Sequence, residues 1–428
     1  MPVSLICRLL TIPFFLFLVS CSNTENQLVS TPVTTTDNTS LLLVPNQLKA
    51  PPSIKGVQLY RKGNQASLPI IELNSENKLI LEFDELTTLS GQFIIQFSHR
   101  NQDWSKSGLP DPWIMEGINE LVLFGGEPNR TNRPNYFHYS LEFPTREIEF
   151  KVSGNYLLHV LDYNSGTELF SLPFFISEQE GEQVHQVETL FNQGQNGQAL
   201  DQLFGEYRYP DFVEFPQFNL SYTFTQNRFW GQSRKADQYS FTNEGETEFH
   251  ISRGNAFPAS FDFTSLNLSE LSLQNPSIFS IDPTAIPTEV ILKDDFLNFL
   301  SDPSPTFNAE FGLPDKSLLA RYSEVSFRLN TGGNTTINDF YLIGDFNQWS
   351  ISDREKLRYN RELGVWETKL LIKEGNYSYK YVTLEGKEID PILLSDSITK
   401  RDQEYVSFVY YLDPDLQYDR LLHAKLFQ

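Results

Sequence analysis

From Ile54 onward, hydrophobic residues alternate with polar ones along the chain, and this period predicts β-strands rather than helices. Before residue 178 the alternation falls into seven short runs rich in β-branched and aromatic residues, separated by clusters of Gly, Pro, Asn and Ser. These runs are IKGVQLY, LPIIEL, KLILEFD, QFIIQFSH, YFHYSLEF, NYLLHVLDY and ELFSLPFFI. Seven short strands with turn signals between them are typical of a β-sandwich. We therefore expect an N-terminal β-sandwich at residues 54–178.

The remaining sequence predicts two further β-rich domains. A polar stretch, SEQEGEQVHQ at 177–186, interrupts the pattern and indicates a boundary. Alternation resumes in QFNLSYTFTQN, TEFHISR and SFDFTSLNL, and later in SEVSFRLN, INDFYLIGDF, GVWETKLLI, NYSYKYV and EYVSFVYYL. PTEVILKDDFLNFL at 287–300 is ambiguous and fits a strand followed by one helical turn. We expect a middle β-rich domain at 179–320 and a C-terminal β-sandwich at 321–428, so the fold class is all-β with sandwiches in tandem.

The chain begins with a segment that resembles a bacterial lipoprotein signal. An apolar run from Leu9 to Val19 is shorter than the about 20 residues of a transmembrane helix, and Pro13 interrupts it. It ends in LVSC, which is similar to the lipobox, although Ser20 stands where Gly or Ala is usual. The resemblance implies that residues 1–20 are a signal peptide and that Cys21 is lipidated. The alternative is an ordinary secretory signal cut near Ser20, with no special role for Cys21.

Cysteine count and charge add to this picture. Cys7 and Cys21 are the only cysteines, so a processed and lipidated chain has no free thiol and no disulfide, and its domains depend on their cores. The net charge is −22, and removal of residues 1–20 takes away one Arg and no acidic residue. Such a chain is repelled by nucleic acid and by anionic lipid, so membrane attachment would depend on acyl chains. Ser22 follows the cysteine where an inner-membrane retention signal places Asp, which favours the outer membrane.

Residues 21–53 are rich in Ser, Thr, Asn and Pro and predict a flexible tether between the anchor and the first domain. The run LLLV at 41–44 is an exception within it, and we expect this run to dock on the folded part.

The sequence gives no sign of catalysis. It contains no GK[ST] phosphate loop, no HExxH and no GxSxG motif. Its histidines occur singly, without the spacing that brings two imidazoles onto one metal; they are His99, His138, His159, His185, His250 and His423. We expect a protein that is not an enzyme, with no catalytic residues, no cofactor and no metal site.

The run YLIGDFNQWS at 341–350 predicts a turn after a strand, in which Gly344 permits a positive φ and Phe346 returns to the core. With its surroundings it resembles early-set immunoglobulin-like modules that bind glycogen. The resemblance implies glycan contacts by Trp349 and by Lys380, but Glu388 stands where the second tryptophan of those modules falls. Stacking on sugar needs two flat faces, so the substitution argues against retained binding.

A wider set of segments resembles the plug protein family of the type IX secretion system. They include SIKGVQLYRKGNQASLPIIELNSENKLILEFDEL, SHRNQDWSKS, YFHYSLEFP, SGNYLLHVLD, TQNRFW, EFHISRGN, GDFNQW, EGNYSYKYV and EYVSFVYYLDPDLQYDRLL. The resemblance spans about Ser53 to Leu422 and departs from relatives at Arg100, where Cys is common. It implies an outer-membrane protein facing the periplasm that closes the large translocon barrel when no other partner occupies it.

The long connection between residues 99 and 139 holds the expected contact residues for that partner. A loop of this length inside a compact domain is more often functional than idle. The expected contacts are Trp104, Trp113, Tyr136 and His138. The alternative for these rings is that they cap the first sandwich. Two other functions stay open, a glycan-binding lipoprotein that uses Trp349 and Lys380 and a structural scaffold lipoprotein.

Overall fold

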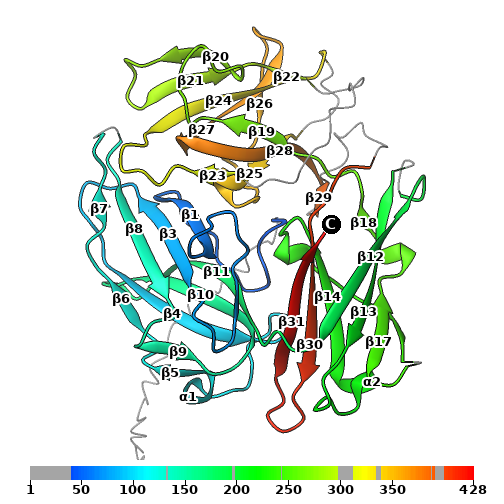
Figure 1. Cartoon of the computed structure of the whole chain (residues 1–428). Helices are drawn as coiled ribbons and strands as arrows, with labels where there is room; N and C mark the ends of the chain where they lie inside the picture. Colours follow the sequence, from blue (N-terminus) through cyan, green and yellow to red (C-terminus); the bar gives the residue numbers. More distant parts are fainter. Residues whose placement is uncertain are drawn as a thin grey trace, which may run out of the picture. The chain divides into compact units, whose positions relative to one another are not determined.

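The computed structural model describes residues 40–131, 134–194, 198–241, 243–296, 312–333, 339–386, 388–390 and 400–428. The predicted signal peptide, Cys21 and the first part of the predicted tether lie outside the described residues. The described chain is almost entirely β-structure, arranged as three two-sheet sandwiches (Figure 1). The prediction of an all-β fold of tandem sandwiches is confirmed.

The first sandwich consists of a sheet in the order β1-β3-β8-β7 and a sheet in the order β2-β11-β10-β4-β6, with the small pair β5-β9 beside them. Every one of the seven predicted runs overlaps one of its strands. The strands are β1 (Ile54–Arg61), β2 (Ile70–Glu72), β3 (Leu79–Glu85), β4 (Phe93–Arg100), β5 (Met115–Gly117), β6 (Leu121–Leu123), β7 (Glu127–Pro128), β8 (Phe137–Phe143), β9 (Ile148–Phe150), β10 (Gly154–Asp162) and β11 (Glu168–Ser177), with a short helix α1 (Asp111–Ile114).

Aromatic residues on the inward faces of these strands form the first core. In β4 every second residue is buried, as the alternating pattern FIIQFSHR predicts. β11 is instead buried on both faces, because Phe174 faces the first core while Phe175 packs outward. The Phe175 ring stacks on Phe408 with centroids 4.5 Å apart, and this contact joins the first sandwich to the second.

The second sandwich pairs a sheet in the order β12-β13-β17-β16, with β18 beside β13, against a sheet in the order β15-β14-β30-β31. The elements are β12 (Glu182–Leu190), β13 (Leu200–Arg208), α2 (Pro216–Asn219), β14 (Leu220–Gln226), the 3₁₀ turn η2 (Trp230–Gln232), β15 (Arg234–Lys235), β16 (Gln238–Ser240), β17 (Glu246–His250), the 3₁₀ turn η3 (Arg253–Asn255), β18 (Phe257–Pro258), β30 (Tyr405–Leu412) and β31 (Asp419–Phe427). Its core includes Tyr207, Tyr222, Phe249 and Tyr405.

The third sandwich pairs the sheet β20-β21-β24-β27-β26, with β22 beside β24, against strands that gather on β28. The elements are β19 (Thr264–Asn267), β20 (Ile278–Asp282), β21 (Thr288–Leu292), β22 (Asp295–Phe296), β23 (Leu313–Pro314), β24 (Tyr322–Asn330), β25 (Tyr341–Gly344), the 3₁₀ turn η4 (Asp345–Asn347), β26 (Arg358–Asn360), β27 (Val365–Lys373), β28 (Gly375–Glu385) and β29 (Glu388–Asp390). In the ambiguous stretch 287–300, strands run to Phe296, and the expected helical turn falls outside the described residues.

The third sandwich is inserted into the second. The chain leaves the second sandwich after β18, builds the third, and returns to add β30 and β31 beside β14. At the insertion point the two passages touch, since the amide of Arg401 donates to the carbonyl of Ala259 at 2.8 Å. Beyond residue 178 the sheets therefore group the chain differently from the expected ranges 179–320 and 321–428.

The described part of the predicted tether is packed rather than free. Leu41, Leu43 and Val44 are buried, as expected for the run LLLV. Gln47 donates to the carbonyl of Ser171 at 2.9 Å, and the amide of Leu41 donates to the carbonyl of Trp349 at 3.2 Å. Residues 40–53 thus run along all three sandwiches, and any free tether ends before residue 40.

Candidate functional site

The turn in YLIGDFNQWS is built by its own side chains. β25 ends at Gly344, and Asn347 closes the turn by accepting from the amide of Gly344 and donating to the carbonyl of Leu342, both at 2.9 Å. Gly344 has φ 178°, so the expected positive φ at this residue is wrong. Glycine is needed there for space, because a Cβ would lie 2.6 Å from the carbonyl oxygen of Ser378. The left-handed residues are Gln348 and Trp349.

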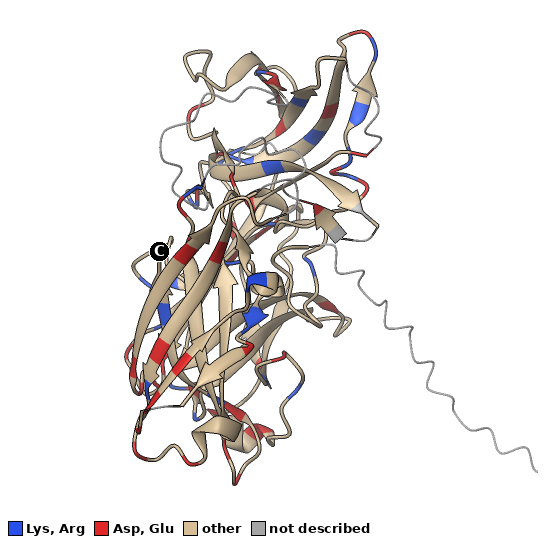
Figure 2. Cartoon of the chain, turned by 90° about the vertical axis from the view of Figure 1, so that its right-hand side faces the viewer, with Lys and Arg blue, Asp and Glu red and all other residues tan. Residues whose placement is uncertain are grey.

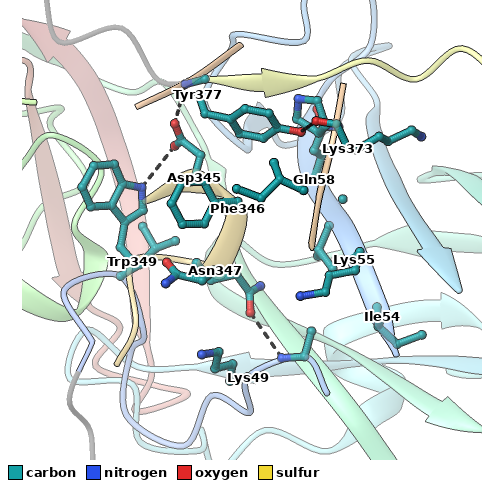
Figure 3. A pocket seen from close by; sticks show the side chains of 18 of the residues that line it. Lys49, Ile54, Lys55, Gln58, Asp345, Phe346, Asn347, Trp349, Lys373 and Tyr377 are labelled. Carbon is teal, nitrogen blue, oxygen red and sulfur yellow. Dashed lines mark hydrogen bonds between the residues drawn. The ribbon is translucent and has the colours of Figure 1, made fainter. Parts of the chain in front are cut away.

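Trp349 is buried at a junction between domains. It is 1% exposed, and its ring meets Phe263 edge-on with centroids 4.9 Å apart and lies 5.4 Å from Phe229. Its indole Nε1 donates to Asp345 at 3.1 Å (Figure 3). The ring is therefore covered on its faces by protein and is not available for stacking on a sugar in this structure.

Lys380 is also enclosed. It is 7% exposed, and its ammonium group pairs with Asp262 and lies over the Phe261 ring. The side chain of Glu388 lies outside the described residues, so the third expected position of the glycan site is not placed. Trp349 and Lys380 both contact residues 261–263, the link from the second sandwich to the third. The contacts of these two side chains are those of a packed domain junction.

Tyr136 and His138 belong to a buried polar network between the first and third sandwiches. Tyr136 is 1% exposed and its hydroxyl donates to the carbonyl of Ala320 at 2.9 Å. His138 Nδ1 lies 2.7 Å from Asp84 Oδ1. The other oxygen of Asp84 accepts from Lys373 Nζ and from the Tyr322 hydroxyl, each at 2.7 Å. This network fixes β3 of the first sandwich against β24 and β27 of the third.

The two tryptophans of the long connection lie in opposite environments. Trp104 is 6% exposed and packs edge-on against Phe175, in the cluster that joins the first and second sandwiches. Trp113 lies on α1 and is 53% exposed. Of the four expected contact residues, Trp113 alone presents most of its side chain to solvent.

The same connection exposes other apolar residues that the sequence analysis did not single out. Ile118 is 71% exposed and Phe124 is 58% exposed, with Val122 between them on β6. Phe124 lies beside the half-exposed ring of Tyr163, at 6.1 Å between centroids. We name Trp113, Ile118, Val122 and Phe124 the connection surface. β6 lies outside the predicted runs, and the uniformly apolar run LVLF has no period that would indicate which face is covered.

Asp345 is the described acidic group whose pKa is raised most clearly, and it too is structural. Burial raises the pKa of Asp345 to about 7, against the opposing effect of N–H bonds from Ser378, Gly312 and Trp349. The described residues contain no group of three His, Cys, Asp or Glu side chains that could hold a metal ion. Among the described helices, none is long and apolar enough to cross a membrane. Asp and Glu are spread over loops and strands in the view of Figure 2.

Comparisons with solved structures give the fold. A hypothetical protein from Parabacteroides merdae superposes with a TM-score of 0.80 at 21% identity, over 89% of this chain and 98% of that one. The C-terminal domain of the Streptococcus agalactiae AgI/II polypeptide BspA covers 88% of this chain and 99% of its own, but with a TM-score of 0.18 and 8% identity it carries no argument. No curated protein matches the sequence.

A family model identifies the first sandwich. The model described as the type 9 secretion system plug protein 1st domain matches residues 54–178. Those limits run from the first residue of β1 to the residue after β11, so the match covers the whole first sandwich. This agrees with the resemblance carried by the sequence segments. Through residues 54–178, the chain carries the first domain of the type IX secretion plug family.

Proposed function

We propose that this chain is a non-enzymatic, outer-membrane-associated lipoprotein that binds and closes the large translocon barrel of the type IX secretion system when the barrel is idle. The observation that carries the proposal is the plug protein first domain at residues 54–178. A plug blocks a pore sterically, and this role needs a rigid protein rather than a reactive site.

The contacts between the sandwiches support the proposal, because a body that closes a pore must resist deformation. The buried pair of Lys373 and Asp84 joins the first and third sandwiches, with Nζ and Oδ2 2.7 Å apart. Arg420 and Glu178 join the second sandwich to the end of the first through two hydrogen bonds of 2.6 and 2.9 Å. Buried packing and paired charges of this kind hold domains in one arrangement.

The connection surface is the proposed contact with the barrel. Trp113, Ile118 and Phe124 are each more than half exposed and come from one segment of the plug domain. Exposed aromatic and large aliphatic residues that gather on one segment commonly mark an interaction surface. Trp104, Tyr136 and His138 pack in the domain junctions and are not proposed as contacts.

Co-purification tests the proposal. A tagged chain, extracted from the outer membrane in mild detergent, is expected to retain a very large barrel protein of the secretion system. The double variant Trp113→Ser with Phe124→Ser is expected to reduce recovery of the barrel at least about tenfold, since such anchors dominate interface energies. Phe279→Ser, which removes a ring 64% exposed on β20, is the matched control and should leave recovery unchanged.

Two outcomes would contradict the barrel-closing role. One is the absence of any barrel protein from the extracted complex in a host that possesses the secretion system. The other is an envelope whose permeability to bulky dyes does not change when the chain is deleted, since an unplugged barrel of this size should leak.

Anchoring by Cys21 is a separate part of the proposal. One cysteine at the end of a signal-like segment would supply acyl chains, and more than one chain is sufficient for stable membrane attachment. Cys21→Ser is expected to move the protein from the outer-membrane fraction to the soluble periplasmic fraction. A variant that stays in the membrane fraction of cells lacking the barrel would rule out the acyl anchor.

A further inference from the structure

A cavity of about 830 Å³ lies between the first and third sandwiches. Its walls are the residues of β1 from Ile54 to Tyr60 and of β27 from Lys369 to Lys373. The packed segment at residues 49–53 and the turn at 345–349 close it further. Figure 3 shows side chains from these four sources directed toward one space.

Both strand walls have an edge that no described strand pairs. β1 is the last strand of its sheet, with β3 on one side only. β27 pairs with β24 along its length, but β26 covers its other edge only at Val365–Glu367. From Thr368 to Lys373 that edge is without a strand partner in the described chain. Unpaired edges offer rows of N–H and C=O groups, which an extended peptide can take up as an added strand.

The cavity also holds more positive than negative charge, although the whole chain has a net charge of −22. Lys49 and Lys55 point into it, and Figure 3 labels both. Glu355 lies 3.8 Å from Lys49, but no carboxylate of the described residues lies within 4.0 Å of the Lys55 or Arg354 side-chain nitrogens. The lining holds two other carboxylates: Glu324 lies 3.7 Å from Lys369, and Asp345 accepts from three N–H groups. Glu355 is therefore the lining carboxylate left to face the cations Lys49, Lys55 and Arg354.

The electrostatic state of the two lysines agrees with this imbalance. Burial lowers the pKa of Lys55, and the neighbouring charges of Arg354 and Lys49 lower it further, while Glu355 opposes them. Burial lowers the pKa of Lys49 as well. A cation that is partly desolvated and has no partner is costly, and an anion that entered the cavity would offset this cost.

Apolar side chains complete the lining. Val57 and Leu59 come from β1, and Phe346 and Leu370 come from the third sandwich; all four are only partly buried by their own cores. Alternation of apolar and charged contacts beside a strand edge suits a peptide whose side chains alternate in the same way.

We propose that this cavity binds an extended acidic peptide segment of a partner protein, with its main chain along the edge of β1 and a carboxylate between Lys55 and Lys49. The proposal goes beyond barrel closure, because the cavity lies apart from the connection surface and uses none of its residues. An acidic peptide is favoured over a free anion because both strand edges provide main-chain partners that a small anion would leave unused.

Fluorescence anisotropy with the full-length purified protein tests the site. The probe is a dye-labelled peptide as long as the lining run of β1, with valine and glutamate in alternation. It is compared with a peptide in which lysine replaces glutamate and with one N-methylated at alternate amides. The glutamate peptide is expected to bind at least about tenfold more tightly than either, since the first comparison removes charge pairing and the second removes main-chain hydrogen bonds.

Lys55→Gln is expected to weaken binding of the glutamate peptide about tenfold. Lys293→Gln, which removes an exposed lysine elsewhere on the third sandwich, is the matched control and should leave the affinity unchanged. The Lys55 variant should melt no lower than the wild type, because it removes an unpaired and partly desolvated charge. Failure to fold therefore does not obscure the result.

Three results would overturn the proposal. The first is equal affinity for the glutamate and lysine peptides, and the second is equal affinity for the N-methylated peptide. The third is full displacement of the glutamate peptide by inorganic phosphate at matched concentration, which would make the cavity a site for small anions. If the glutamate peptide does not bind at all, it shows no preference over the lysine peptide, and the proposal is overturned in the same way. None of these measurements involves the barrel, so their failure is distinct from failure of the proposed function.

Discussion

At the scale of single residues, the most distinctive motif of the sequence has a structural role. GDFNQW looks like a sugar-binding turn, but its polar side chains make hydrogen bonds inside the protein. Asn347 closes the turn, and Asp345 accepts from three N–H groups, including that of Trp349. A motif specifies only which residue types follow one another. Whether neighbouring domains cover the ring of Trp349 depends on tertiary packing. Sequence reasoning could find the turn but could not find that Phe229 and Phe263 cover its tryptophan.

Asp345 predicts a pH dependence of stability. Its pKa rises from 3.8 to about 7 on folding, so the protonated form favours the folded state. Its contribution to the free energy of unfolding is complete below about pH 4 and is lost as pH rises through about 7, with a slope of at most about 1.4 kcal/mol per pH unit. Urea unfolding measured from about pH 4 to 8 should show a decline in the wild type that is absent from Asp345→Asn. Parallel profiles for the two proteins would contradict the assignment.

Lys373 predicts a large loss on truncation. It is 3% exposed, and without it the carboxylate of Asp84 stays buried beside Tyr322 and His138 without its lysine partner. Lys373→Met is expected to cost about 3–5 kcal/mol in the free energy of unfolding, measured by urea denaturation. Adding Asp84→Asn should recover part of this loss, because the second change removes the unpaired charge.

The matched control for Lys373 is Lys356→Met. Lys356 also pairs with an aspartate, Asp339, but both side chains are more than one-third exposed. Its loss should cost less than about 1 kcal/mol. Equal costs for the two lysines would show that the buried network does not join the sandwiches.

At the scale of elements, strands with apolar alternation were predicted and strands without it were missed. β4 reads clearly from FIIQFSHR, whereas β12 lies partly in the stretch interpreted as a polar boundary. Its inward positions include Gln183 and His185. Gln183 is buried because it accepts from Ser407 across the sandwich at 2.8 Å. A polar inward face satisfied by a distant partner removes the periodicity on which strand prediction depends.

The packed N-terminal segment gives a prediction at this scale. Gly231, in the turn η2, lies so close to the segment that a Cβ would meet the carbonyl oxygen of Leu43 at 2.0 Å. Gly231→Ala is expected to cost about 1–3 kcal/mol in the free energy of unfolding. It should also expose residues 41–48 to protease, because the clash is with a backbone atom, which cannot move aside as the end of a flexible side chain can. Limited proteolysis followed by mass spectrometry measures the release.

Gly254→Ala provides the comparison for Gly231. Gly254 lies in the other 3₁₀ turn of the second sandwich, and a Cβ there would meet no atom within 4 Å. It should leave both stability and the cleavage pattern nearly unchanged. Release of the segment in both variants, or in neither, would show that its docking does not depend on the close approach at Gly231.

At the scale of the whole molecule, the sequence predicted the class and the first sandwich but not how the later sandwiches share the chain. The first sandwich is continuous in sequence, so composition and turn signals mark its limits. The second depends on β14 pairing with β30, from Leu220 with Tyr411 to Gln226 with Tyr405. Local patterns carry no information about such distant partners. The same limit explains the contact residues, since Trp104 is buried where the second sandwich packs on the first, whereas Trp113 stays 53% exposed.

The insertion predicts that the third sandwich can be removed. The amide of Arg401 donates to the carbonyl of Ala259, and Gln403 Nε2 donates to the carbonyl of Phe261 at 2.8 Å, so the two ends of the insertion are adjacent. Replacing residues 264–400 with a short Gly/Ser linker is expected to leave the first and second sandwiches folded, because surface-adjacent ends tolerate excision. Circular dichroism and a cooperative melting transition measure this, with a lower melting temperature expected because Phe229 and Phe261 lose their cover.

A chain that ends at residue 400 is the opposite test of the same topology. It keeps the third sandwich but lacks β30 and β31, half of the four strands in the sheet β15-β14-β30-β31. It also loses Phe408 and Arg420, which hold the second sandwich against the first. We expect protease to cut this chain throughout residues 182–258 while residues 54–178 stay protected. If the truncated chain resisted cleavage there and the excised chain did not fold, the second sandwich would not depend on its C-terminal strands, and the interleaved assembly would be wrong.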